Sequence, residues 1–382
     1  MLKAYKHRIY PTREQANLLN KHFGCVRFVY NLALETKQTA YVGNRVSLSR
    51  YDLQAQLPDL KKECIWLKEI NAQSLQVSLL NLDNAFIKFY KGQADFPKFK
   101  KKSNRQSFNI PQDVRIKNNK LLIPKFREGI DIILHRVFKG IIRQTTIIKT
   151  STGKYFASIL VENNVAIPVK VNIESNSTIG VDLGLKSFLI TSNSEKFDNP
   201  KYLKNALLKL SYIQSKYSKH KGHKTKHKLA LLHEKVANQR KDFLQKLSSE
   251  LISENQTICL EDLNIKGMIQ NHCLAKSISD VGWGMFVEML RYKAEWQGKN
   301  IIQIEQFEPS SKTCHVCGHI NKELTLKDRE WTCNNCNTTN DRDINAAINI
   351  KNFALKNKLC VGRTLENHEE LPTLVGALTY EA

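Results

Sequence analysis

The first ninety residues change from a strand-like pattern of side chains to a helical one. Residues 3–10 alternate well enough to predict a short β-strand, and Pro11 ends it. Thr12 precedes Gln15 by three residues, which is the spacing of a capping box, so a helix is expected to begin there. Apolar residues then recur at roughly helical spacing to about residue 90. The pattern predicts a helical module over residues 11–90.

Shorter β-like runs follow, separated by polar turns. They lie at residues 119–123, 131–135, 145–149 and 154–162. We expect them to join the N-terminal strand in a small β-barrel. This β-barrel domain would comprise residues 1–10 and 91–175.

The second half of the chain alternates buried strands with helices. Strands are expected at 177–182, 187–191, 257–261 and 300–305, and helices at 201–254, 281–297 and 343–355. Such alternation predicts an α/β layer domain over residues 176–310 and 338–362, interrupted by an insert at 311–337. Residues 363–382 show no clear period and are expected to form a disordered tail.

The charge of the chain narrows the class of partner. The 382 residues carry 59 Lys and Arg against 36 Asp and Glu, a net charge of +23, which indicates a nucleic acid. No apolar run reaches the ~18 residues needed to cross a membrane, and the first residues lack the apolar core of a signal peptide. The nine cysteines are odd in number and unevenly spaced, unlike a secreted disulfide framework. The cytoplasm is therefore the expected compartment.

Two basic tracks are candidates for contact with phosphates and bases. Residues 201–228 contain nine lysines, three histidines and no acid, and residues 96–102 mix aromatic rings with lysines. Rings beside cations can stack on bases while the lysines neutralise phosphates. A solvated helix face is the alternative for the first track. The predicted contacts are Lys98, Phe99, Lys100, Lys101, Lys102, Arg105, Lys221, Lys224, Lys226 and Lys228.

Three acids stand at the ends of buried elements that are far apart in sequence. Asp182 ends one expected strand, Glu261 ends another, and Asp343 opens the last helix. Carboxylates at neighbouring strand ends can hold two Mg²⁺ ions, which would activate a water for phosphodiester hydrolysis. Asp341 is the rival to Asp343, which is preferred because Ala346, Ala347 and Ile350 would pack one face of that helix.

Four cysteines form two Cys-x-x-Cys pairs within residues 314–336. The pairs are Cys314 with Cys317 and Cys333 with Cys336, and 15 residues separate them. This spacing is typical of a zinc ribbon, in which one structural Zn²⁺ has all four coordination positions filled. A redox dithiol is the alternative. His315 is expected beside the metal site and not as a ligand.

The motifs, taken in order, resemble those of the transposon-encoded TnpB (OrfB) family. The likeness rests on residues 4–15 and 23–31, on Gly180-Val181-Asp182-Leu183-Gly184, and on residues 260–265, 309–314 and 341–350. It extends to about residue 355. The resemblance implies an RNA-guided, Mg²⁺-dependent endonuclease that cuts double-stranded DNA, with a ribonuclease-H-like (RuvC) domain in which Asp182, Glu261 and Asp343 hold Mg²⁺.

The same resemblance assigns roles to the other parts of the chain. The helical module would be a recognition domain, the β-barrel a wedge domain, and the zinc ribbon an insert that binds the target nucleic acid. A guide RNA from the transposon end would pair with the target. A short adjacent motif would be read near Gln73, Gln76, Ser107, Phe108 and Asn109. No obligatory protein partner is expected, and the enzyme would associate with the prokaryotic nucleoid when on its target.

Two other functions remain open at this point. The chain could be a nuclease-inactive, RNA-guided repressor, or a guide-independent DNA-binding protein of transposition. Cleavage separates the first from the nuclease, and binding after removal of RNA separates the second.

Overall fold

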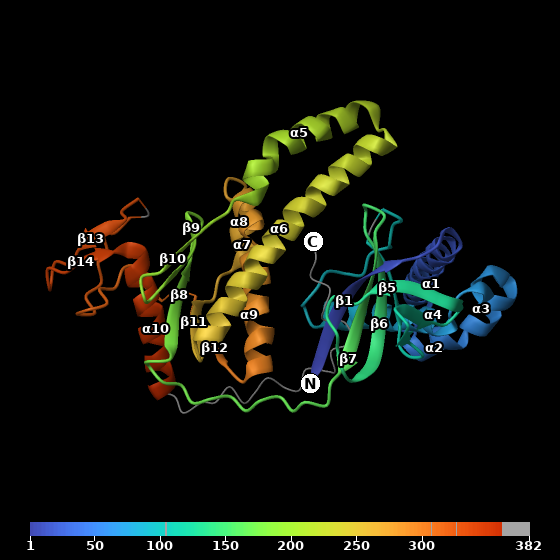
Figure 1. Ribbon diagram of the computed structural model, residues 1–382, viewed down its shortest axis with the longest axis horizontal. Helices are drawn as coiled ribbons and strands as arrows, with labels where there is room; N and C mark the ends of the chain where they lie inside the picture. The colour runs from blue at the N-terminus through green and yellow to red at the C-terminus, as the bar shows by residue number, and fades with distance from the viewer. Residues whose placement is uncertain (104, 307, 326, 361–382) are drawn as a thin grey trace. The chain divides into compact units, whose positions relative to one another are not determined.

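The computed structural model describes residues 1–103, 105–306, 308–325 and 327–360, and the predicted tail at 363–382 lies outside them. This described chain divides into two compact units, the first of residues 1–165 and the second from residue 166 onward (Figure 1).

The helices of the first unit lie within the predicted helical module. They are α1 (Arg13–Asn44), α2 (Arg50–Ala55), α3 (Leu57–Glu63) and α4 (Ala72–Tyr90), with a 3₁₀ turn η1 (Ile65–Glu69). The capping box is confirmed: the side chain of Thr12 accepts from the backbone N–H of Gln15, and that of Gln15 accepts from the N–H of Thr12. Both exchanges satisfy backbone groups that the first turn leaves free, so α1 begins where the sequence predicted.

The strands of the first unit form one mixed-length antiparallel sheet. They are β1 (Leu2–Tyr10), β2 (Gln106–Ile110), β3 (Arg115–Lys117), β4 (Lys120–Ile123), β5 (Phe126–Ile133), β6 (Ile141–Lys149) and β7 (Tyr155–Glu162). Their order is β2-β6-β7-β1-β5-β4-β3, so the N-terminal strand joins this sheet, as expected, and lies at its centre. Among the described strands β2 and β3 are the edges and no ladder joins them. The expected closed barrel is therefore not confirmed.

Helices and sheet of the first unit share one hydrophobic core. Leu19 and Leu75 from the helices belong to the same buried cluster as Ile147 and Ile159 from the strands. The predicted recognition and wedge modules are therefore packed as one body, although their separate boundaries remain a prediction.

The second unit is built on a five-stranded mixed sheet. Its strands are β8 (Thr178–Leu183), β9 (Ser187–Thr191), β10 (Lys196–Asp198), β11 (Thr257–Glu261) and β12 (Asn300–Ile304), in the order β10-β9-β8-β11-β12. The pairs β8–β11 and β11–β12 are parallel, whereas β9 and β10 run antiparallel to their neighbours. Strands β8 and β11 each have four successive buried residues, which is typical of strands covered on both faces.

Helices cover both faces of this sheet, which confirms the α/β layer prediction (Figure 1). On one face Ile258 and Leu260 of β11 pack with residues of α6, α8 and α9. On the other face Cys259 packs with Ile350 and Ala354 of α10. The helices of the unit are α5 (Tyr202–His220), α6 (His223–Glu254), α7 (Ile265–Gln270), α8 (Ala275–Val281), α9 (Trp283–Gln297) and α10 (Arg342–Cys360).

Two parts extend from this layered body. Helices α5 and α6 form a long hairpin, and a small insert between β12 and α10 carries the two-stranded sheet β13 (Glu330–Thr332) and β14 (Thr339–Asp341) (Figure 1). None of the described helices combines the length and the apolar character that a membrane span requires.

Candidate functional site

The parallel register places Asp182 and Glu261 side by side, each near the carboxyl end of its strand. Val181 of β8 pairs with Leu260 of β11, and each acid is the next residue of its strand. Asp343 lies in the first turn of α10, the helix that packs along β8. Residues separated by about eighty positions in the sequence therefore meet at the carboxyl ends of two neighbouring strands.

A glycine allows α10 to approach β8 closely. A Cβ atom at Gly180 would lie 2.0 Å from the carbonyl oxygen of Ala347 and 2.8 Å from the backbone nitrogen of Lys351. Since both atoms belong to helix backbone, no side-chain movement could make room for it. The absence of a side chain at this position thus fixes how near the helix, and with it Asp343, lies to the strand that carries Asp182.

The electrostatics of the three acids reflect their proximity. Burial raises the pKa of Asp182 to about 7, and repulsion from Glu261 and Asp343 acts in the same direction. The charge of Arg342 and a hydrogen bond from the backbone of Leu183 oppose the shift only in part. Carboxylates that repel one another when ionised form a set of oxygen ligands suited to a hard divalent cation. The donors present therefore fit Mg²⁺.

The rival acid, Asp341, is occupied elsewhere. Its Oδ1 accepts hydrogen bonds from the backbone N–H groups of Asp343 at 3.0 Å and Ile344 at 3.1 Å, so it caps the N-terminus of α10. Its other oxygen pairs with Lys196 at 2.7 Å. Both carboxylate oxygens thus have partners that keep Asp341 at the helix end.

Two side chains next to the acids were not predicted as site residues, although Ser310 lies in the motif at residues 309–314. The hydroxyl of Ser310 donates to Oε1 of Glu261, and Arg329 lies with Nη1 3.5 Å from Oδ2 of Asp343. Ser310 follows the strand that pairs with Glu261, so the meeting of parallel strands at one edge could have indicated it. Arg329 comes from the cysteine insert, and its position depends on tertiary packing.

A second group of polar residues lies around a cavity of about 160 Å³ that opens beside Glu261. Arg291 pairs with Glu288 at 3.0 Å, and Gln303 donates to Asp262 at 3.4 Å. Glu288 and Asp262 also line the cavity, and each is therefore held by a partner of its own.

The four predicted cysteines come together in the insert. All four sulfur atoms lie within 4.8 Å of one another, with 3.7 Å between the Sγ atoms of Cys314 and Cys336 and 3.5 Å between those of Cys317 and Cys333. A tetrahedral site with Zn–S bonds of about 2.3 Å has sulfur–sulfur edges of about 3.8 Å. The spacing is too wide for disulfides and fits a four-thiolate metal site.

The turns that hold these cysteines depend on left-handed backbone conformations. Gly318 follows the first pair with φ +75°, and Asn337 follows the second with φ 54°. Asparagine tolerates this region better than most residues, so it serves in the second turn as glycine does in the first. Hydrogen bonds from the Asn335 side chain and the His319 backbone lower the pKa of Cys317 to about 6.

His315 lies beside the cysteine cluster without belonging to it. Its backbone N–H donates to Oδ1 of Asn345 at 2.9 Å, and its Nδ1 lies 3.0 Å from the same oxygen. His315 therefore links the insert to α10.

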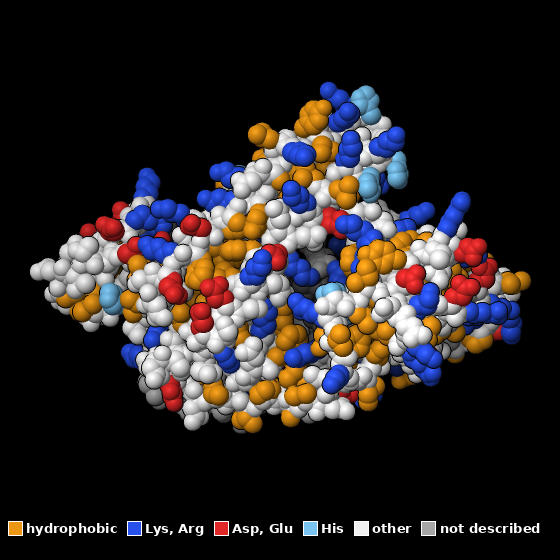
Figure 2. All heavy atoms as spheres, in the orientation of Figure 1, with side chains coloured by type: hydrophobic (Ala, Val, Ile, Leu, Met, Phe, Trp, Pro, Cys, Tyr) orange, Lys and Arg blue, Asp and Glu red, His pale blue; other side chains and the backbone are white. Residues whose placement is uncertain are grey.

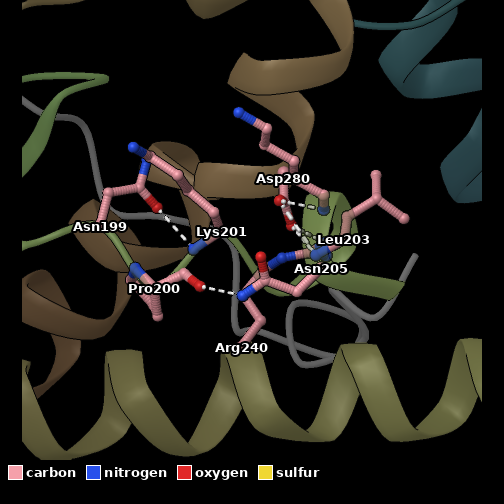
Figure 3. A network of polar contacts seen from close by, with 8 residues as sticks. Asn199, Pro200, Lys201, Leu203, Asn205, Arg240 and Asp280 are labelled. Carbon is pink, nitrogen blue, oxygen red and sulfur yellow. Dashed lines mark hydrogen bonds and ion pairs between the residues drawn. The ribbon is translucent and has the colours of Figure 1, made fainter. Parts of the chain in front are cut away.

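The α5–α6 hairpin presents the lysine track to solvent. Lys221, Lys224, Lys226 and Lys228 are all exposed, and Figure 2 shows basic and histidine side chains gathered at the far end of the hairpin. The hairpin is anchored at its base by Asp280, which accepts from the backbone N–H of Leu203 at 3.0 Å and pairs with Arg240 of α6 at 3.0 Å (Figure 3).

The second basic track is partly exposed. The side chains of Phe99, Lys101, Lys102 and Arg105 are exposed, and Lys98 pairs with Asp95 at 3.4 Å. Lys100 differs from them, because its Nζ lies 3.8 Å from the centroid of the Tyr30 ring and burial lowers its pKa to about 8. Lys100 is therefore held against α1 and differs from its freely exposed neighbours.

The residues expected to read an adjacent motif are divided between surface and core. Gln76 is exposed, and Gln73, Ser107 and Asn109 are partly buried. Phe108 is 2% exposed, with its ring 4.9 Å from that of His22 and 5.3 Å from that of Phe23. Its predicted contact with nucleic acid is corrected accordingly: the strand alternation turns Phe108 inward with Ile110.

Comparisons with known proteins agree along most of the chain. Three family models match: a "Helix-turn-helix domain" (residues 1–45), a "Probable transposase" (158–272) and a "Cas12f1-like, TNB domain" (283–350). A Streptomyces pristinaespiralis protein named "Putative RNA-guided DNA endonuclease" is 36% identical over 369 residues, 94% of this chain and 90% of that protein.

More distant relatives extend the same likeness. The Escherichia coli K12 protein "Putative RNA-guided DNA endonuclease InsQ" is 28% identical over 378 residues, 91% of each chain. The "TnpB-like protein L770" of Acanthamoeba polyphaga mimivirus is 25% identical over 401 residues, 93% of this chain and 74% of that protein.

Proposed function

The chain belongs to the TnpB (OrfB) family, and on that premise we propose that it is an RNA-guided endonuclease that hydrolyses double-stranded DNA. The mixed α/β sheet and the four-cysteine cluster fit a RuvC-like nuclease with a zinc-ribbon-like insert. Asp182, Glu261 and Asp343 are the proposed catalytic residues.

One observation supports this assignment above the others. Asp182 lies on one of two neighbouring parallel strands, and its burial together with repulsion from Glu261 and Asp343 raises its pKa to about 7. An arrangement that costs free energy in the absence of a cation is typical of a functional site and unusual for solvated surface acids.

The three carboxylates would hold two Mg²⁺ ions. When bound, such ions activate a water molecule and stabilise the leaving oxygen of the cleaved phosphodiester. The chain's own contribution is to fix the ligands: the strand register sets Asp182 beside Glu261, and the packing of α10 on Gly180 sets the position of Asp343.

The basic surfaces are the proposed guide and target contacts. Exposed lysines of the α5–α6 hairpin neutralise phosphates, and the exposed Phe99 offers a ring for stacking. Base pairing with a guide RNA derived from the transposon end reads the target. Gln73, Gln76, Ser107 and Asn109 are the proposed readers of a short adjacent motif. The enzyme would act in the cytoplasm, on the nucleoid.

The cysteine insert is proposed to carry one structural Zn²⁺. Four thiolates complete a tetrahedral shell, which leaves no open position for catalysis. The metal would hold the β13–β14 sheet next to the start of α10, since β14 ends at Asp341 and the helix begins at Arg342.

The deciding experiment is cleavage of a plasmid by the purified chain with its co-purified RNA and Mg²⁺. The RNA is sequenced first, so that matched and mismatched targets can be compared. We expect linearisation of the matched plasmid alone, and its loss in Asp182→Asn and Glu261→Gln variants. Full cleavage by either variant would overturn the assignment of the acids.

The same preparation separates the other two functions. Guide-dependent binding without cleavage would identify an RNA-guided repressor. Binding that survives treatment with ribonuclease, or strand transfer of transposon ends without a guide, would identify a guide-independent transposition protein.

A further inference from the structure

The contact between Ser310 and Glu261 belongs to a hydrogen-bond network that links the end of β11, the segment at residues 309–313 and helix α10. Ser310 is 5% exposed and lies between β12 and the first cysteine pair. Its hydroxyl donates to Oε1 of Glu261. Among the described residues this is the hydrogen bond that the Glu261 side chain accepts, and it lies on Oε1, so Oε2 can meet a cation.

Two buried asparagines of α10 fix the segment that carries Ser310. Asn345 is 1% exposed and Asn349 is 2% exposed, and they lie one turn apart on the same face of the helix. The Asn349 amide donates to the carbonyl oxygen of Ser310 at 2.8 Å, and that of Asn345 donates to the carbonyl oxygen of Thr313 at 2.7 Å. Both ends of the segment are thereby tied to the helix that carries Asp343.

Hydrogen bonds within the segment make it stiff. The backbone N–H of Thr313 donates to the carbonyl oxygen of Pro309 at 3.0 Å, and the Thr313 hydroxyl donates to the same oxygen at 2.8 Å. Ser310 therefore has little freedom to move away from Glu261. A hydrogen bond from such a rigid donor orients the carboxylate before any metal arrives.

We propose that Ser310 is a positioning residue that orients Glu261 for metal binding, with Asn345 and Asn349 holding Ser310 in place. The inference rests on the proposed role of Glu261 as a metal ligand. Loss of a hydrogen bond that orients a metal ligand typically weakens metal binding roughly 10- to 100-fold.

The test measures Mn²⁺ binding by electron paramagnetic resonance, with the full zinc-loaded chain free of nucleic acid. Ser310→Ala removes the hydroxyl. Ser310→Thr and Ser310→Val form a pair of equal shape that differs only by a hydroxyl, so any strain from the added methyl group affects both. Ser311→Ala is the neighbouring control, and Glu261→Ala is the reference for a lost ligand.

We expect Ser310→Ala and Ser310→Val to raise the Mn²⁺ dissociation constant 10- to 100-fold, while Ser310→Thr and Ser311→Ala stay within threefold of the wild type. Zinc content and melting temperature, measured on the same samples, should remain at wild-type values. The comparison of Ser310→Thr with Ser310→Val remains informative even if Ser310→Ala fails to fold.

Equal Mn²⁺ affinity in the Ser310→Thr and Ser310→Val variants would overturn the role of Ser310. If Glu261→Ala instead binds Mn²⁺ as the wild type does, the proposed catalytic site itself is wrong. The two failures are therefore distinguishable.

Discussion

Asp341 caps the helix whose first turn presents Asp343. The backbone N–H of Asp343 donates to Oδ1 of Asp341 at 3.0 Å, while the other oxygen of Asp341 pairs with Lys196. Two acids separated by one residue thus have different roles: Asp341 holds the helix end, and the charge of Asp343 helps to raise the pKa of Asp182.

This division predicts opposite outcomes for the two acids. Asp343→Asn should reduce DNA cleavage at least a thousandfold with the melting temperature preserved, because it removes a proposed metal ligand. Asp341→Asn keeps a capping side chain and should retain cleavage within about tenfold. Asp341→Ala should lower the free energy of unfolding by about 1 kcal/mol through loss of the cap. Cleavage rates and melting curves of the three variants test this, and normal cleavage by Asp343→Asn would refute it.

The cysteine cluster should hold one zinc ion per chain. Cys333→Ser should lose that metal and expose the insert to protease, because the insert has a small core of its own in Cys314, Leu324, Trp331 and Cys333. Elemental analysis and limited proteolysis give the readouts. Cys273→Ser is the matched control, since Cys273 is exposed and lies outside the cluster. Full zinc in both variants would contradict the site.

His22 should make the first unit sensitive to acid. It is 1% exposed, accepts from the backbone N–H of Asn71 at 3.2 Å, and lies with Nδ1 2.8 Å from the carbonyl oxygen of Leu18. The ring is thus neutral with its proton on Nδ1. Burial lowers its pKa to about 4 from an unfolded value of 6.5. Because the unfolded chain binds the proton more readily, this stability is present above pH 6.5 and is lost as the pH falls toward 4.

A comparison with His22→Gln isolates this effect from other titrating groups. Hydrogen exchange of α1 peptides gives the stability of the first unit in each protein. The advantage of the wild type should shrink by about 2.5 kcal/mol between pH 7.5 and 4.5. An advantage that stays constant over this interval would show that the ring is already charged or exposed in the folded unit.

The lysine hairpin should contribute to RNA affinity through charge. Replacing Lys224 and Lys228 with glutamine should weaken RNA binding and reduce the slope of log affinity against log salt by about 1.4, if each lysine neutralises one phosphate of a single strand. The exposed pair Lys62 and Lys68 is the control, because both lie on the helical module. Filter binding at several salt concentrations measures both slopes, and equal changes in the two variants would argue against a hairpin site.

Strong local patterns made much of the fold predictable. The capping box at Thr12 and the buried runs of β8 and β11 each contain the information for their element. Strands β3 and β10 and helices α7 and α8 were not predicted, because each is too short and shows too little periodicity, and the alternation in β2 was not recognised as a strand. The shared core of the first unit was not predicted either, since it depends on contacts between distant segments.

In the candidate site, too, residues could be predicted where a local pattern marks them, but not where the packing of distant elements places them. Asp182 and Glu261 could be inferred from strand ends, and Asp343 from the start of a helix. The contact of Ser310 with Glu261 and the burial of Phe108 are set by how elements pack, although the alternation of Phe108 with Ile110 carried an unused signal. The close approach at Gly180 needed the helix to be placed against the strand.

The placement of Asp343 on α10 has a consequence for the order in which the protein is synthesised. The ribosome completes the first unit, both basic tracks, Asp182 and Glu261 before it reaches residue 342. Since the N-terminal domains of a nascent chain generally fold first, an interrupted polypeptide would contain the proposed RNA-binding surfaces while lacking the third acid and the helix that covers Cys259. On the proposed function, the set of catalytic acids is therefore complete only after the last helix has been synthesised.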